Sequence, residues 1–396
     1  MTPPRWRLAL SIQSSLSQAS WVGVRIMVGY RAIELGASPF LLALLAASFA
    51  VPTIAAALPA GRLSDRVGGS IVAFAGLLVA SVGTTAIVIL PPEIGVLVAG
   101  TLVVGLGHLL VMVGQQTFVA HASRDGSVDS GFGTLAAAAS IGQLIGPPAV
   151  TLASTLGSPL APNTTVGLAV CICFTALAFP MIAVLRRGDV QRRRATEPSP
   201  RTPLTQVLRA PELWRALAVS GAVLVTVDLL YTFVPLWAVS RDISAVTVGL
   251  LLALRAFVSV ISRFGLGGLV ARFGRRLLIL FATVCGVLSL AALPFVDAWG
   301  AIPVMVALGV ALGIPQPLTM AWTTAITPAS AHGAALGLRL TANRIAQVAI
   351  PLAVGGLAGP LGITAIFWAN AAVLAAGAVI VATSRTIDGS SDDLTS

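Results

Sequence analysis

Ionisable side chains are rare inside the long apolar stretches of this sequence, and four of them could carry chemistry there. Asp228 is an acid, and Arg25, Arg255 and Arg344 are arginines. Charges at such positions are costly in a membrane and usually serve a function. A carboxylate whose surroundings alternate between apolar groups and an arginine can load and release a proton. Asp228 and Arg25 are therefore candidates for proton coupling, together with His108, because an imidazole titrates near neutral pH.

Two other interpretations of the same charges remain open. Arg25 and Asp228 are expected at comparable depth, so they could form a fixed ion pair without a transport role. Arg255 and Arg344 could then hold a carboxylate or phosphate group, which a guanidinium binds in bidentate geometry. Arg344 could instead bond to backbone carbonyls or to Gln347 on its own helix.

The composition shows what kind of protein must position these groups. The 396 residues are 57% hydrophobic and only 10% charged, and the mean hydropathy is +0.95. Soluble domains carry about 25% charged residues, so this composition excludes an ordinary soluble enzyme. A disordered chain is excluded too, because disorder needs low hydrophobicity and high charge. An all-α membrane protein remains, since backbone groups in lipid must bond within their own segment.

Breaks in hydropathy divide the chain into twelve predicted transmembrane helices, each near the length that spans a bilayer. They cover residues 8–33, 39–60, 71–90, 95–119, 131–154, 166–185, 214–238, 247–268, 277–296, 301–326, 335–358 and 364–384. Arginines gather in the loops that a cytoplasmic N-terminus would place inside, whereas Arg31 and Arg241 fall in outer loops. By the positive-inside rule, both termini are expected in the cytoplasm of a multi-pass inner-membrane protein.

The two halves of the chain repeat one another. Trp6-Arg7 precedes the first segment as Trp214-Arg215 precedes the seventh, and Gly146-Pro147 matches Ile350-Pro351. The repeat predicts two pseudo-symmetric six-helix bundles with a substrate path between them. The expected organisation is an N-terminal half at 1–186, a cytoplasmic linker at 187–213, a C-terminal half at 214–387 and a cytoplasmic tail at 388–396.

One repeated loop resembles a known family. The run Gly61-Arg-Leu-Ser-Asp-Arg-Val-Gly68 is similar to the signature loop of the major facilitator superfamily, and Gly267–Gly274 is its second copy. The resemblance implies a twelve-helix transporter that works by alternating access. We expect Gly61 to allow a close helix approach and Gly68 a tight turn. The hypothesis for this loop is a conformational latch made of Gly61, Asp65, Arg66, Gly68 and Arg339, although Asp65 could merely cap its own loop.

A second run resembles drug:proton antiporters of this superfamily. Gly142, Gly146 and Pro147 in the fifth segment match the core of their antiporter motif, where small residues and a proline imply close packing and a kink. The fourth segment lacks the arginine that such exporters commonly carry there. The family architecture implies cavity candidates at Gln18, Arg25, Gln115, Asp228, Tyr231, Arg255, Gln316, Trp322 and Arg344.

These observations lead to a proton-coupled multidrug efflux transporter, an antiporter of small organic compounds. The alternative is an organic-anion transporter or exchanger with Arg255 and Arg344 on the substrate, and a receptor or channel is a third interpretation. Catalysis is not expected, because the sequence has no phosphate-binding GxxxxGK[ST] loop and no cluster with metal-ligand spacing. We expect an ion gradient, carried by protons, in place of a cofactor. The expected partners are a small-molecule substrate and the lipid bilayer, with no nucleic acid, for a monomeric protein.

Overall fold

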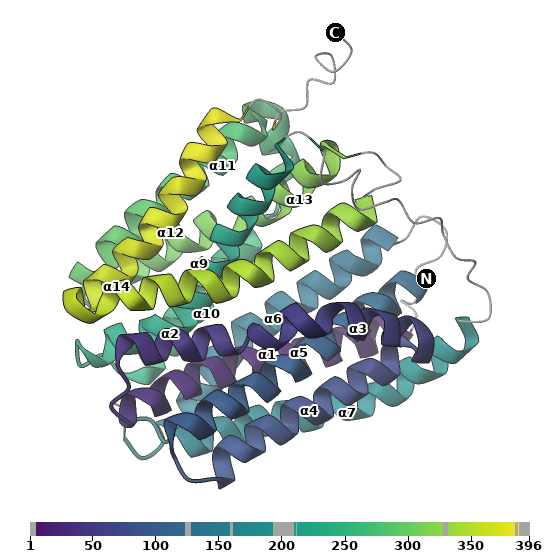
Figure 1. The fold of residues 1–396 in the computed structure, drawn as a ribbon, viewed down its shortest axis with the longest axis horizontal. Coiled ribbons are helices and arrows are strands. Elements are labelled where there is room, and N and C mark those ends of the chain that lie inside the picture. The colour runs from purple at the N-terminus through teal and green to yellow at the C-terminus, as the bar shows by residue number, and fades with distance from the viewer. Residues whose placement is uncertain are drawn as a thin grey trace. The chain divides into compact units, whose positions relative to one another are not determined.

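The computed structural model describes residues 5–122, 128–158, 161–192, 210, 212–327, 332–384 and 387, and its regular elements are all helical in these ranges. Most of the predicted linker at 187–213 and the whole tail at 388–396 lie outside the described residues. The α-helices, labelled in Figure 1, are α1 (Arg5–Glu34), α2 (Pro39–Ser48), α3 (Val51–Val67), α4 (Gly69–Ile89), α5 (Ile94–Ala122), α6 (Val128–Ser154), α7 (Thr164–Arg192), α9 (Leu213–Val239), α10 (Ala245–Ile261), α11 (Leu266–Ala292), α12 (Ala301–Gly313), α13 (Pro315–Ala325) and α14 (His332–Thr383). A short 3-10 helix, η2 (Leu293–Phe295), follows α11.

Nine helical stretches in the described ranges are long and apolar enough to cross a membrane. Three predicted segments, 8–33, 247–268 and 335–358, are not among these nine. Polar residues lower the hydropathy of the first and third, and the helix α10 of the second is only 17 residues long. The three segments outside these nine stretches are also those that carry Arg25, Arg255 and Arg344.

The helices form two compact units. The first contains Met1–Pro198 and Tyr231–Ala253, and the second contains Ser199–Leu230 and Leu254–Ser396. The first part of α9 thus belongs to the second unit, while its end from Tyr231 belongs to the first.

In the first unit, α1 packs against α6 and α7, and α4 packs against α5 and α7 (Figure 1). Glycines set the spacing between α4 and α5. A Cβ on Gly76 would lie 2.5 Å from the nitrogen of Val111, and one on Gly107 would lie 2.8 Å from the Cα of Ala80. These backbones therefore approach more closely than any larger residue would permit.

In the second unit, α11 packs against α12 and α14 around an apolar cluster that includes Ile279, Leu318 and Trp322. The label α14 covers two helices, because Gly362 has a φ of +74° and breaks the helix (Figure 1). The first part of α9 contacts both of them. Gly221 faces Ala346, and the hydroxyl of Thr226 donates to Asn370 Oδ1 at 3.0 Å.

The two copies of the repeated loop share a backbone conformation. Gly68 has φ +103° and ψ +145° between α3 and α4, and Gly274 has φ +76° and ψ +159° within α11. Positive φ with extended ψ is strained for any residue with a Cβ, so both positions require glycine. The predicted tight turn at Gly68 is confirmed, and the repeat is structural at this point.

Candidate functional site

A carboxylate and a guanidinium are joined through an amide inside the second unit. Gln347 Nε2 donates to Asp228 Oδ2, and Arg344 Nη1 donates to Gln347 Oε1 at 2.8 Å. Asp228 is 9% exposed and Gln347 is 6% exposed, so their hydrogen bond is buried, whereas Arg344 is half-buried. The amide is oriented by the charges at its two ends, with its N–H toward the anion and its oxygen toward the cation. We call these three residues the carboxylate–amide–guanidinium chain.

Helix spacing explains how the sequence assembles this chain. Arg344 and Gln347 are three residues apart in α14, so they lie on adjacent turns of one face. Asn343 and Gln347 are four residues apart, and Gly221 of α9 faces this side of α14. The Oδ1 atom of Asn343 is buried and has no hydrogen-bond partner among the described residues. The boundary between α9 and α14 is thus a polar seam, which is unusual in a protein interior.

Arginines gather at a second place in this unit, around the first turn of α13. Arg263 Nη2 donates to Gln316 Oε1 at 3.0 Å, and its Nε donates to the carbonyl of Gly313 at 3.4 Å. Arg339 Nη2 donates to the carbonyl of Gln316 at 3.4 Å and to Thr319 Oγ1 at 3.3 Å. Arg263, Gln316 and Arg339 form what we call the Gln316 cluster.

A proline explains why Arg263 finds a carbonyl there. The oxygen of Gly313 would normally accept from the residue four positions later, but that residue is Pro317, which has no N–H. The arginine therefore satisfies a backbone group that the helix leaves open. Arg255, on α10 of the same unit, is 1% exposed, and its backbone oxygen would lie 2.8 Å from a Cβ on Gly309.

The other two candidates for proton coupling lie in an aromatic cluster of the first unit. Arg25 is 4% exposed, and its guanidinium carbon lies 5.5 Å from the ring centroid of Trp21 and 5.3 Å from that of Phe49. His108 stacks on Trp21 with the centroids 3.9 Å apart and the planes 7° apart. Aromatic faces stabilise a cation, and both Arg25 and His108 contact the ring of Trp21.

A cavity of about 20 Å³ lies beside His108, lined by Ser17, Ser20, Trp21, Val24, Leu77, Ala80, Thr84, Val104, His108, Val111 and Thr175. This volume is sufficient for one water molecule. The hydroxyl of Thr175 donates to Ser20 Oγ at 2.8 Å, and the hydroxyl of Ser20 donates to the carbonyl of Cys171 at 2.9 Å. The first unit therefore holds neutral polar groups near its histidine.

The remaining cavity candidates lie in different surroundings. Gln115 of α5 is buried and donates to Gln13, and Gln18 of α1 is half-buried. Tyr231 is 2% exposed in the part of α9 that belongs to the first unit. Trp322 is fully buried in the apolar cluster of the second unit, so it does not present the accessible ring that its assignment implied.

The antiporter-like residues make a backbone contact within the first unit. A Cβ on Gly142 would lie 2.8 Å from Gln18 Cβ, and one on Gly146 would lie 2.7 Å from the carbonyl oxygen of Ala19. Pro147 leaves α6 helical, and its carbonyl accepts from the hydroxyl of Thr151 at 2.8 Å. These residues hold α6 directly against α1, as close packing predicts.

The latch residues are divided between the two units. Asp65 and Arg66 are exposed in the first, and Arg339 lies in the second. Within the first unit, no described residue outside its own stretch of helix lies within 4 Å of where a Cβ on Gly61 would stand, so no close helix approach to Gly61 is seen within this unit. The pairing of Asp65 with Arg339, like that of Arg25 with Asp228, joins different units and stays a prediction.

Comparison with known proteins places this arrangement in a broader context. A family model described as Major Facilitator Superfamily matches residues 10–324 and 241–393. No annotated protein matches the sequence closely enough to count as a relative.

Solved structures share the fold along nearly the whole chain. A nucleoside transporter, NupG, matches with a TM-score of 0.75 at 13% identity, covering 96% of this chain and 100% of its own. A peptide transporter, POT, in complex with sulfate matches with a TM-score of 0.77 at 17% identity, covering 98% and 96%. A POT family transporter in complex with 5-aminolevulinic acid matches with a TM-score of 0.76 at 13% identity, covering 96% of each chain. These identities are low, so the likeness is one of fold.

Proposed function

This chain belongs to the major facilitator superfamily, and on that premise we propose that it is a proton-coupled exporter of small, drug-like organic compounds. Twelve membrane-spanning helices form two six-helix halves, joined by a cytoplasmic linker and alternating around a central site in the inner membrane. Asp228 is the proton carrier. The observation that supports this role is the carboxylate–amide–guanidinium chain, because it links a titratable acid on α9 to a cation on α14.

A proton on Asp228 would change this chain directly. The ionised carboxylate can only accept, as it does from the Gln347 amide, whereas a carboxyl protonated on Oδ2 also has an O–H to donate at that position. If the amide rotates to offer its oxygen to Asp228, its N–H groups turn toward Arg344, which has no acceptor. In that rotated arrangement, protonation of Asp228 releases Arg344 from Gln347. The charge state of α9 is in this way transmitted to α14.

Export by antiport is supported by the run from Gly142 to Pro147, which resembles the motif of drug:proton antiporters. Its glycines press α6 onto α1, which makes that pair of helices one rigid body. A rigid pair in one unit and a proton-dependent seam in the other are the parts that a rocking mechanism needs. One proton entering through Asp228 would accompany each exported molecule.

The test uses proteoliposomes with an imposed pH gradient and a cationic dye as the exported probe. Wild type should move dye against its concentration gradient, and Asp228→Asn should lose this movement. Asp242→Asn is the matched control, because Asp242 is exposed and its φ of +53° is tolerated by asparagine. Dye transport by Asp228→Asn at the wild-type rate would remove Asp228 from the mechanism.

The Gln316 cluster favours a second candidate, the exchange of organic anions. Its two arginines, with Arg255 in the same unit, form a concentration of positive charge that suits carboxylates or phosphates. The same vesicles distinguish the candidates. Benzoate exchange that persists without a pH gradient and in Asp228→Asn, but is lost in Arg255→Gln, would assign the protein to anion exchange.

A further inference from the structure

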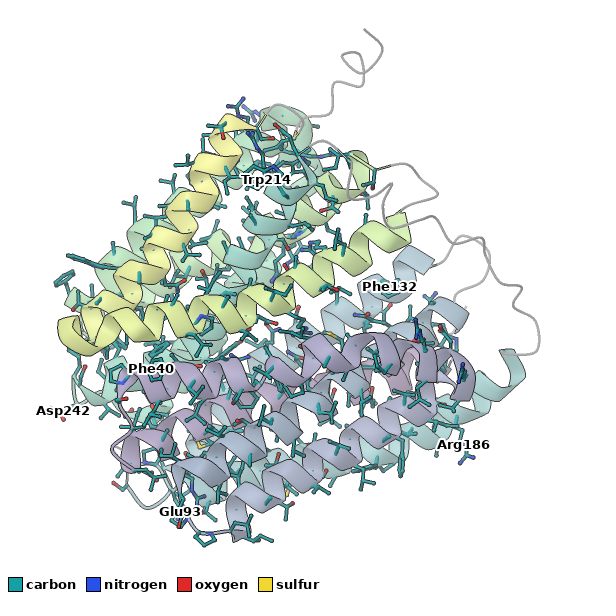
Figure 2. The ribbon with its side chains drawn as sticks, viewed as in Figure 1. Phe40, Glu93, Phe132, Arg186, Trp214 and Asp242 are labelled. Atoms are coloured by element: carbon teal, nitrogen blue, oxygen red, sulfur yellow. The ribbon has the colours of Figure 1, made fainter. Side chains whose placement is uncertain are left out.

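A second polar cavity lies in the first unit, away from all the groups discussed above. Its volume is about 490 Å³, and it is lined by Arg31, Glu34, Leu35, Pro92, Ala161, Asn163, Thr164 and Thr165. These residues come from the end of α1, the turn before α5 and the start of α7. Figure 2 labels Glu93, next to Pro92, at the end of this unit opposite Arg186. The positive-inside rule places this end outside the cell.

The burial and bonding of Arg31 indicate that this cavity binds a ligand. Its side chain is only 8% exposed, and its Nη1 atom is buried without a hydrogen-bond partner among the described residues. A buried guanidinium N–H without an acceptor costs free energy, which a bound anion would recover. Glu34 lies three residues later on α1, but its Oε2 accepts from the hydroxyl of Thr164 at 3.2 Å. Glu34 keeps further acceptor positions and feels the charge of Arg31, yet Arg31 Nη1 makes no hydrogen bond to it among the described residues.

The start of α7 adds a second attraction for an anion. Asn163 precedes the helix, its Oδ1 accepts from the nitrogen of Val166 at 3.1 Å, and its own nitrogen donates to the carbonyl of Ser154 at 2.7 Å. These bonds hold the first turn of a 29-residue helix at the cavity wall. The first N–H groups of a helix and its dipole both favour negative charge. Thr165 places a further hydroxyl-bearing residue in the lining.

We propose that this outer cavity binds a small organic monocarboxylate, with the carboxylate on Arg31 and at the start of α7. The volume falls within the range of small-molecule sites. The carboxylate of Glu34 repels a second negative charge, so di- and tricarboxylates bind less well. The site is independent of Asp228, which lies in the second unit.

The test is a fluorine NMR titration of para-fluorobenzoate with the full-length protein in phosphatidylcholine nanodiscs. Arg31→Gln should weaken binding by about tenfold or more, because it removes a charge-assisted hydrogen bond. Arg241→Gln is the matched control, since Arg241 belongs to a different predicted outer loop, is exposed and does not line the cavity. The neutral analogue para-fluorobenzamide should bind much more weakly than the benzoate. Equal affinity of wild type and Arg31→Gln, or of the two probes, overturns the proposal.

Two further variants keep the test decisive if Arg31→Gln misfolds or if proton coupling at Asp228 fails. If Arg31→Gln does not fold, Thr165→Trp places a bulky ring at an exposed lining residue beside the start of α7, where it should block the carboxylate and abolish binding. Benzoate affinity that survives in Thr165→Trp would contradict the proposal. Asp228→Asn should bind para-fluorobenzoate as wild type does, so a failure of proton coupling leaves this site intact. Loss of binding in Asp228→Asn would place the carboxylate elsewhere.

Discussion

The two units use equivalent helices in opposite ways. In the first unit, α1 meets α6 backbone to backbone at Gly142 and Gly146. In the second, α9 meets α14, where the repeat places Ala346 and Ile350 instead of those glycines. At this boundary the glycine is on α9 instead, where Gly221 faces Ala346, and the Asp228–Gln347 hydrogen bond joins the two helices. Loss of two glycines thus accompanies the gain of a charged seam.

This difference indicates how the two copies of a repeated helix bundle can take different roles, one in stability and one in transport. Glycine contacts are tightly packed, so the first unit has one arrangement of α1 and α6. A hydrogen-bonded chain that ends in a titratable acid has two arrangements, one for each protonation state. We therefore expect substitutions at the α1–α6 glycine contact to act on stability, and only those in the carboxylate–amide–guanidinium chain to act on transport as well.

The largest effect is expected at the glycine contact. Gly142→Ala should destabilise the protein by about 2 kcal/mol or more, because its Cβ would overlap the backbone of α1. Thermal unfolding in detergent, followed by size-exclusion chromatography, measures the change. The control is Gly133→Ala in the same helix, where no described atom lies within 4 Å of the new Cβ. If both variants unfold at the same temperature, the rigid contact is refuted.

The comparison is sharpened by two glutamines at equivalent positions, Gln347 in the second unit and Gln143 in the first. Gln347→Leu should abolish gradient-driven dye transport and destabilise the protein by about 2 kcal/mol, because Asp228 and Arg344 lose their shared partner. Gln143→Leu should transport dye normally. Proteoliposome transport and thermal unfolding test both, and equal transport by the two variants would break the proposed division of work.

A smaller contrast is expected between two amides, the half-buried Gln316 and the buried Gln115. Gln316 bonds to a charged group, Arg263, whereas Gln115 bonds to the neutral Gln13. Hydrogen bonds to charged groups contribute about 1.5–3 kcal/mol and neutral ones about 0.5–1.5 kcal/mol. Gln316→Leu should therefore lower the unfolding temperature more than Gln115→Leu. The reverse order would mean that the Gln316 cluster is solvated enough to need no amide.

The smallest effect concerns pH at the outer cavity. Glu34 is the last residue of α1, and partial burial raises its pKa, while Thr164 and the charge of Arg31 lower it. Protonation removes the negative charge beside Arg31, so para-fluorobenzoate should bind a few-fold more tightly as the pH falls from about 7 to about 5. The NMR titration repeated at both values measures this shift. Glu34→Gln should bind equally at both, and a persisting shift would assign the titration to another group.

Local signals explain which parts of the site could be predicted. Arg344 and Gln347 share a helix face by their spacing alone, and the structure confirms this hydrogen bond. The donation from Gln347 to Asp228 could not be predicted, because it depends on how α9 and α14 are rotated about their axes. Trp322 was assigned to the cavity from its helix, but packing turned its ring into the apolar cluster. Arg263 escaped selection because its acceptor becomes available only through Pro317.

The sequence by itself determined the membrane class, the helical segments, the repeat and the family. All of these depend on hydropathy over about 20 residues or on short motifs such as Gly61–Gly68, and such signals are local. Only the tertiary structure decided which polar groups meet: Asp228 with Gln347, Arg263 with Gln316, and Arg31 with an open cavity. The physical reason is that a helix in lipid satisfies its own backbone, so its formation needs no partner. Its side chains find partners only when neighbouring helices set their distance and rotation.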